Sequence, residues 1–347
     1  MLATQTSDTL PRSEFEYGMN HCVCLAGYVN DVPQARANAY GYRVLGAGLV
    51  RTLQARGMVH DRSKVALHIL PPDSARFMLG RWNWLYTMHE NSVLPDKYLD
   101  PLAQADLVLV PSSWVREIMC KHLPETKVVV VPPGIEPEYR YIERDVCRIG
   151  GRPFRFLFVG APNVRKGIIE LREAWMRSFW DKPWFELYFK VSGLSQPAPI
   201  AKRGNIVMDN RDLTTEELNS LYQESDCLVS PSRGEAFNLV LAEAMATGMP
   251  CVATGYGGPM DYLDETTGYP VDFETRPGPY KDMGRDLPGT YPIVYPVVDD
   301  LEKKMHEVYT RYYEALRRGR DASQRVISRF QWSKTSAQIA ALLQNVP

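Results

Sequence analysis

Apolar segments with strand-like and helix-like spacing alternate along the whole chain. Strands are predicted at 21–28, 65–70, 84–88, 107–110, 127–131, 154–159, 184–191, 205–208, 227–229 and 250–253. Helices are predicted at 44–56, 114–122, 168–179, 214–223, 301–316 and 322–346. Such alternation favours an α/β protein built on parallel sheets.

Two segments interrupt this alternation. Residues 137–153 are polar and rich in charge, as expected of an interdomain linker. We therefore predict an N-terminal Rossmann-like domain over 1–147 and a second domain over 148–330, and 347 residues suffice for two cores. Residues 273–296 hold many Pro, Gly and Tyr with little periodicity, and they predict a long ordered loop.

Composition excludes several classes of protein. The net charge of -1 gives no general attraction to nucleic acid or to an anionic membrane. No stretch approaches the roughly 20 apolar residues that span a bilayer, and the polar segment 1–17 lacks a signal-peptide core. The six cysteines show no CxxC spacing, which favours structural thiols in a reducing compartment. The sequence thus predicts a cytoplasmic protein.

Polar loops follow three strands of the second domain, at 160–167, 230–235 and 254–258. Because the carboxyl ends of parallel strands meet at one edge of a sheet, these loops should converge. The first loop carries Arg165 and Lys166 just before a helix, whose N-terminus favours anions. We expect a phosphate site there, although a solvated basic turn fits the same residues.

Two glutamates, Glu235 and Glu243, lie in an otherwise apolar run that predicts a helix beginning near residue 237 or 238. Glutamate is seldom buried unless it is paired or binds a ligand. A separation of about 12 Å prevents both carboxylates from gripping one atom. They could instead accept hydrogen bonds from hydroxyls at the two ends of a sugar nucleotide. The structural alternative for Glu243 is a buried residue paired with Lys or Arg.

At these residues the chain resembles the retaining GT-B glycosyltransferases of family 4. The matching features are Glu235 and Glu243 separated by seven residues, Lys166-Gly167, and the segments 105–112, 131–134, 250–258 and 330–332. The resemblance implies two Rossmann-like domains that face each other across a cleft. It also implies that a C-terminal helix at about 331–347 crosses back to the first domain.

The resemblance assigns roles to individual residues. Glu235 would bind hydroxyls of the donor sugar, Glu243 would bind the ribose, and Lys166 would neutralise the departing diphosphate. His89 would face the donor sugar, although a purely structural histidine is the alternative. The remaining donor-side candidates are Arg165, Gly160, Ser230 and the backbone amides of Phe237, Asn238 and Leu239. The acceptor-side candidates are Gly41, Tyr42 and Glu90.

The chain departs from the family pattern at two positions. Ala161 stands where an arginine is common, and Arg165 could supply that charge. Asn238 replaces a glycine, and asparagine tolerates left-handed backbone angles better than most residues do.

The resemblance implies a hexosyltransferase that uses a nucleoside-diphosphate sugar, UDP- or GDP-linked, with a retaining front-face mechanism. No Asp-x-Asp motif is placed to hold a divalent ion, so we predict metal independence and no permanently bound cofactor. An epimerase on the same fold and a non-catalytic carbohydrate- or nucleotide-binding protein are the competing hypotheses.

The acceptor stays open among a glycan, a lipid-linked molecule, a small molecule and, as the weaker choice, a nucleic acid. Residues 31–81 carry eight Lys and Arg against three Asp. This local excess could suit a phosphorylated acceptor or peripheral contact at the inner membrane face, or it could be a solvated surface balanced by acids elsewhere.

Overall fold

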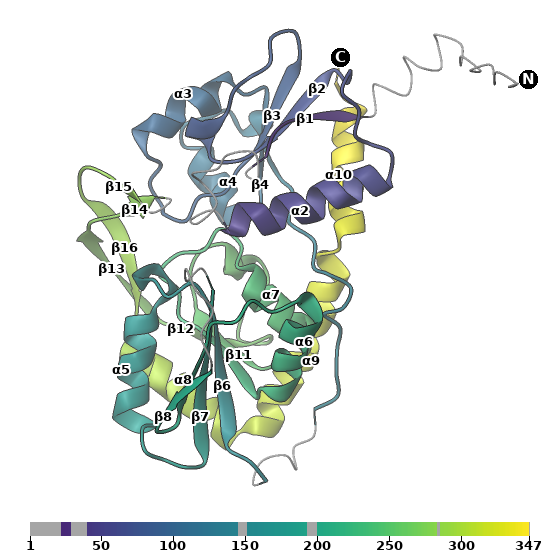
Figure 1. Ribbon diagram of the computed structural model, residues 1–347. Coiled ribbons are helices and arrows are strands. Elements are labelled where there is room, and N and C mark those ends of the chain that lie inside the picture. The colour runs from purple at the N-terminus through teal and green to yellow at the C-terminus, as the bar shows by residue number, and fades with distance from the viewer. Residues whose placement is uncertain (1–21, 29–39, 145–150, 193–199, 283–284, 347) are drawn as a thin grey trace, which may run out of the picture.

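The computed structural model describes residues 22–28, 40–144, 151–192, 200–282 and 285–346. Two domains built on largely parallel sheets stack one above the other, and the chain returns from the second to the first at its C-terminal end (Figure 1). The predicted boundary at 147/148 lies outside the described residues, so the domain limits stay a prediction.

The first domain is a parallel sheet of five strands in the order β1-β2-β3-β4-β5. Its strands are β1 (Val23–Tyr28), β2 (Val65–Ile69), β3 (Trp82–Tyr86), β4 (Leu107–Val110) and β5 (Val128–Val130). Its helices are α2 (Tyr40–Ala55), α3 (Asp96–Gln104) and α4 (Ser113–Met119). Successive residues of β3 face opposite cores, with Leu85 packed near α3 and α4, and Trp84 near α2. Helices therefore cover both faces, as the Rossmann-like prediction requires.

The second domain holds a sheet of seven strands in the order β12-β11-β10-β6-β7-β9-β8. Its strands are β6 (Phe154–Gly160), β7 (Phe185–Val191), β8 (Ala201–Arg203), β9 (Ile206–Asp209), β10 (Cys227–Ser230), β11 (Cys251–Thr254) and β12 (Tyr269–Val271). Its helices are α5 (Ile168–Ser178), α6 (Thr215–Glu224), α7 (Leu239–Ala246), α8 (Val298–Thr310) and α9 (Tyr312–Arg329). One face packs against α5, α8 and the start of α9, and the other packs against α6, α7 and the rest of α9.

The last helix, α10 (Trp332–Leu343), belongs spatially to the first domain. The Trp332 ring lies so close to Gly48 and Gly134 that a Cβ on either glycine would fall 2.0 or 2.5 Å from it. The Trp332 indole donates a hydrogen bond to Glu136 at 3.1 Å, and Ile339 and Leu343 are buried with Leu45 and Leu49 of α2. The predicted crossing of the C-terminal helix to the first domain is confirmed.

Several predicted elements are wrong in detail. The described residues of the segment 273–296, which are 273–282 and 285–296, form a β-hairpin instead of a loop. Its strand β13 (Phe273–Gly278) pairs with β16 (Tyr291–Pro296), and β14 (Lys281–Asp282) pairs with β15 (Arg285–Asp286). Helix α3 was not predicted, because its sequence is mostly polar and contains Pro101. Helix α4 covers Ser113–Met119 instead of the predicted 114–122, and Ser112 caps it by accepting a hydrogen bond from the Val115 amide. The C-terminal helices break at Arg311 and Phe330 rather than between 316 and 322.

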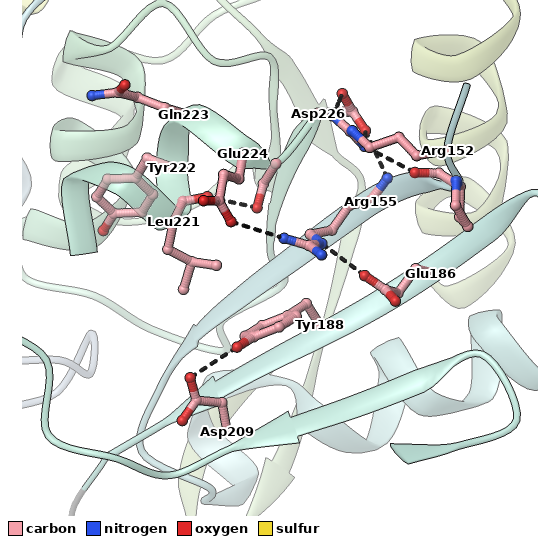
Figure 2. Close-up of polar contacts among 12 residues, drawn as sticks. Arg152, Arg155, Glu186, Tyr188, Asp209, Leu221, Tyr222, Gln223, Glu224 and Asp226 are labelled. Atoms are coloured by element: carbon pink, nitrogen blue, oxygen red, sulfur yellow. Dashed lines mark hydrogen bonds and ion pairs between the residues drawn. The ribbon is translucent and has the colours of Figure 1, made fainter. Parts of the chain in front are cut away.

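Charged residues at the amino ends of the second sheet hold the start of that domain together (Figure 2). Asp226, just before β10, accepts hydrogen bonds from the Arg152 guanidinium at 2.6 and 2.8 Å and from the Arg155 amide at 2.7 Å. The Arg155 side chain donates to Glu186 on β7 at 2.7 Å. We call Arg152, Arg155, Glu186 and Asp226 the amino-end cluster. All four belong to one domain, and each carboxylate has its own cation.

Candidate functional site

The three polar loops of the second domain meet at the carboxyl ends of β6, β10 and β11, as predicted. A Cβ at Gly167 would lie 1.8 Å from the Pro231 carbonyl oxygen, so only glycine allows this approach. The Arg233 amide donates to the Arg165 carbonyl at 2.7 Å, and the Gly258 amide donates to the Glu235 carbonyl at 2.9 Å. This edge of the sheet faces the first domain (Figure 1).

Glu235 lies in the loop before α7, and its carboxylate is buried among donors. Its Oε1 is 2.6 Å from Lys166 Nζ and accepts a hydrogen bond from Ser232 Oγ at 2.7 Å, while its Oε2 is 3.3 Å from the Arg165 guanidinium. Burial alone would raise the pKa of Glu235, but Lys166 and Arg165 outweigh it and hold that pKa at about 2. Glu235 is therefore ionised at any physiological pH.

Arg165 links this loop to the first domain. Its Nε lies 3.0 Å from Glu90 Oε2, and its guanidinium also donates to the Gly234 carbonyl at 2.7 Å. The structure thus places Arg165 beside Lys166, on the same carboxylate of Glu235. Burial raises the pKa of Glu90, and the charge of Arg165 opposes that rise. We call Glu90, Arg165, Lys166 and Glu235 the cleft cluster.

The backbone enters α7 through a left-handed residue. Asn238 has φ 69°, and its side chain both caps the helix at the Leu241 amide and donates to Ser230 Oγ at 3.0 Å. The expectation that asparagine could take the place of glycine here is confirmed. Phe237 is buried in the core, and Leu239 begins the helix. Among the hydrogen bonds of the described residues, none is donated by the amides of 237–239, so these groups can receive an anion.

Glu243 lies one turn inside α7, and its Oε2 accepts a hydrogen bond from the Tyr222 hydroxyl at 3.1 Å. Burial of the side-chain carboxyl group raises the pKa of Glu243 to about 8. Within the part of the chain that the structure describes, Glu243 forms no ion pair, so the structural alternative of a Lys or Arg partner finds no support there.

His89 lies in the loop after β3 and is buried. Its Nε2 donates to the Val93 carbonyl at 2.8 Å, and its ring meets Tyr98 and Tyr280 edge-on. Burial lowers the pKa of His89, which favours the neutral ring. The adjacent Glu90 carbonyl approaches the second domain so closely that a Cβ on Gly234 would lie 2.2 Å from it.

The other acceptor-side candidates lie behind this loop rather than in the cleft cluster. The Tyr42 hydroxyl contacts Thr87 Oγ1 at 2.8 Å and accepts a hydrogen bond from the Met88 amide at 2.8 Å. Tyr42 thus holds the loop that carries His89 through hydrogen bonds to the two residues before it. Gly41 lies in the first turn of α2. Gly160 ends β6 with the aliphatic part of Lys166 packed near it.

Sequence reasoning missed two interactions in the loop that carries Glu235, those of Ser232 and Arg233. Ser232 was open to prediction, because it precedes Glu235 by three residues in the same loop. Arg233 is held by Glu170 of α5 at 2.7 Å, with little of either side chain exposed. That pair joins a loop to a helix distant in sequence, and nothing local in the sequence indicates it.

The basic segment of the first domain is partly compensated. Arg51 pairs with the Glu136 carboxylate at 2.7 Å, whereas Arg81 donates to the main-chain carbonyl of Asp61, which carries no net charge. Arg36 lies outside the described residues. No helix in the described ranges is both long and apolar enough to cross a bilayer. Those ranges also hold no group of three or more His, Cys, Asp and Glu side chains suited to a metal ion, and metal independence stays a prediction.

Residues 153–278 match the family model of glycosyl transferases group 1. An uncharacterized glycosyltransferase of Methanocaldococcus jannaschii is 27% identical over 202 residues, which are 53% of this chain and 51% of that protein. A D-inositol 3-phosphate glycosyltransferase of Arthrobacter sp. is 29% identical over 160 residues, 41% of this chain and 38% of the relative. The chain thus spans about half or less of the length of these curated relatives.

Solved structures match the chain over most of its length. Sucrose-phosphate synthase from Thermosynechococcus elongatus has a TM-score of 0.62 at 17% identity, covering 87% of this chain and 78% of its own. HepE of Anabaena, solved with UDP-glucose, has a TM-score of 0.59 at 13% identity, covering 86% and 82%. The fold is GT-B, as predicted, and the match of residues 153–278 to the glycosyl transferases group 1 model supports a GT-B glycosyltransferase. The named relatives support the prediction of a transferase enzyme.

Proposed function

We propose that this protein transfers a hexose-type sugar from a nucleoside-diphosphate sugar to an acceptor hydroxyl, with retention at the anomeric carbon. The observation that carries the proposal is the convergence of Lys166, Arg165 and Glu235 on the start of α7. Two cations and the free amides of 237–239 suit a diphosphate, while a carboxylate kept ionised suits sugar hydroxyls.

The two halves of a donor would occupy different ends of α7. Glu243, inside the helix, would accept hydrogen bonds from the ribose hydroxyls, and Glu235, in the loop, would accept them from the sugar. In the structure Glu235 pairs with Lys166 at 2.6 Å. A bound diphosphate would compete for that cation and leave Glu235 oxygens available to the sugar.

In the proposed reaction, the bond from the anomeric carbon to the phosphate oxygen breaks, and a bond to the acceptor oxygen forms on the same face. The acceptor proton passes to the departing diphosphate, whose developing charge Lys166 and Arg165 stabilise. His89, held neutral in its buried position, would act on the donor sugar as a hydrogen-bonding group rather than as a cation. Glu90 and Tyr42 lie on the acceptor side of this arrangement.

For the donor we propose a UDP- or GDP-sugar, with no divalent ion required. HepE of Anabaena, which shares the fold, was solved with UDP-glucose, and this favours UDP. For the acceptor, a glycan, a lipid-linked molecule or a small molecule stays ahead of a nucleic acid. We further propose that the protein works in the cytoplasm, with peripheral contact at the inner membrane face where the acceptor is lipid-linked.

A thermal-shift panel of UDP-, GDP-, ADP- and dTDP-sugars tests the proposal without knowledge of the acceptor. One nucleotide class should raise the unfolding midpoint in a concentration-dependent way, because a ligand that binds only the folded state stabilises it. The same donor should raise the midpoint of Glu235→Gln less than that of the wild type. If no nucleotide sugar at millimolar concentration moves the midpoint, the proposal fails. Conversion of the donor sugar to its epimer without acceptor would favour the epimerase instead.

A further inference from the structure

The hairpin 273–296 leaves the second domain after β12 and reaches the first domain beside α3 (Figure 1). Its long strands β13 and β16 pair over six residue pairs, and its outer part is the short β14–β15 pair. Most of β13 is exposed, so this hairpin does not form part of either sheet core. It contacts the rest of the protein at its two ends and at the loop that carries His89.

The outer end is fixed to the first domain by one buried carboxylate. Asp282 Oδ2 accepts a hydrogen bond from the Tyr98 hydroxyl at 2.6 Å and lies 2.7 Å from Lys97 Nζ. Both partners come from α3, and Lys97 also pairs with Asp73 at 3.0 Å. A buried carboxylate is costly unless it is paired, so Asp282 is best accommodated when the first domain is in place.

The inner end of the hairpin is fixed to the loop that carries Glu235. The Arg233 guanidinium lies over the Tyr295 ring of β16 at 4.3 Å and is held by Glu170. Arg233 directly precedes Gly234 and Glu235, and its amide bonds the Arg165 carbonyl. The hairpin therefore connects α3 of the first domain to the loop that carries Glu235.

Between these ends the hairpin covers the His89 loop. The Tyr280 ring is buried edge-on against His89, with ring centroids 6.3 Å apart. Asn91, two residues after His89, donates to the Pro292 carbonyl of β16 at 3.0 Å. Both contacts join residues of different domains, and both lie next to Glu90 of the cleft cluster.

We propose that the hairpin 273–296 is a strap across the interdomain cleft and that Asp282 is a positioning residue for the reaction. With the strap attached to α3, Tyr280 and Pro292 hold the His89–Glu90 loop opposite Glu235. With it detached, the two domains separate, and the donor residues of the second domain keep their own geometry. The catalytic part of this inference rests on the proposed function, whereas the domain closure does not.

The test compares Asp282→Ala with Asp286→Ala in the full chain. Asp286 is the matched control, because it is also a hairpin aspartate paired with a lysine, Lys281, but that pair is exposed and lies within the hairpin. Small-angle scattering should show a larger radius of gyration for Asp282→Ala and an unchanged one for Asp286→Ala. Tyr98→Phe, which keeps the ion pair to Lys97, should give an intermediate value.

Binding and turnover separate positioning from a general loss of structure. UDP affinity by calorimetry should stay within about twofold in Asp282→Ala, because the residues proposed to hold UDP are in the second domain. The rate of sugar transfer should fall about tenfold, consistent with loss of a hydrogen bond to a charged group. Matching scattering curves for Asp282→Ala, Asp286→Ala and the wild type would overturn the strap. If no nucleotide sugar binds while the scattering difference is present, the proposed function fails and the strap stands.

Discussion

The cleft cluster and the amino-end cluster contain the same kinds of charged side chains and lie at opposite ends of the second sheet. They differ in which domains supply the ion-pair partners. In the amino-end cluster, Asp226 and Glu186 are each held by an arginine of their own domain. In the cleft cluster, two cations share Glu235, and Arg165 also reaches Glu90 of the other domain. The first arrangement is complete within one domain. The second depends on how the domains meet and lies beside the amides of 237–239, none of which donates a hydrogen bond within the described residues. Ion pairs by themselves therefore do not mark a site.

The largest difference in transfer rate should follow removal of one lysine at each cluster: Lys166, a member of the cleft cluster, and Lys202, which lies beside the amino-end cluster. Lys166→Ala should slow transfer about 10²- to 10³-fold, because a fixed cation at the developing diphosphate charge is lost. Lys202→Ala removes an exposed lysine 3.5 Å from Glu186 and should leave the rate within about twofold. Initial rates with the donor found by thermal shift provide the measurement. A Lys166→Ala rate within about tenfold of the wild type would contradict the role of Lys166.

Removing one carboxylate charge from each cluster is expected to have the next largest effect. Glu235→Gln should slow transfer about 100-fold by weakening hydrogen bonds to the sugar. It should bind UDP at least as tightly as the wild type does, because Lys166 and Arg165 are released from their ion pairs. Glu186→Gln should change neither quantity. Calorimetry with UDP and with the UDP-sugar measures both, and equal loss of both ligands would refute the assignment of Glu235 to the sugar.

The pKa of Glu235 also fixes the sign of its effect on stability. Since that pKa is lowered from 4.5 to about 2, the ion pairs of Glu235 stabilise the folded state above pH 4.5 and lose this effect as pH falls toward 2. Unfolding of Glu235→Gln should therefore depend less on pH than unfolding of the wild type in that window.

The smallest expected effect concerns Glu243, whose pKa is raised to about 8. If the ribose hydroxyls bind its ionised form, UDP affinity should rise about tenfold between pH 7 and pH 9, with proton release near pH 7. For Glu243→Gln, the change in UDP affinity with pH and the number of protons released should be only those that the titration of UDP itself produces. Calorimetry in buffers of different ionisation enthalpy counts the protons. Identical pH dependence in the two proteins would leave Glu243 with a structural role alone.

The same pKa predicts an opposite trend in stability. Because the folded protein holds the proton of Glu243 more tightly than the unfolded chain does, this residue destabilises the fold as pH rises from 4.5 to about 8. Denaturant unfolding of Glu243→Gln should lack that decline.

Local patterns predicted the parallel sheets well, because buried strands such as β4 and β10 are short apolar runs at regular intervals. They also placed Glu235 in a loop and Glu243 inside the helix, since both follow from where the apolar run begins. The hairpin 273–296 could not be predicted in this way. Its strands are mostly outside the cores, so no face of β13 selects apolar residues, and its prolines are typical of loops.

The partners within the candidate site were less accessible to sequence reasoning. The contact of Arg165 with Glu90 spans two domains, and Arg233 with Glu170 joins a loop to a helix; neither pair has a spacing that identifies it. Glu90 and His89 were noticed through a family resemblance rather than through their own pattern. Their roles, like those of Gly160, Ser230 and Tyr42, stay predictions that the experiments above address.

The return of α10 to the first domain has a consequence for the order in which the protein can fold during synthesis. The core beside α2 is filled by Trp332, Ile339 and Leu343, which are translated after the entire second domain. The second domain lies in one continuous stretch and can complete its core while the ribosome is still adding residues. The first domain, although made first, must wait with an uncovered apolar face until the last helix emerges.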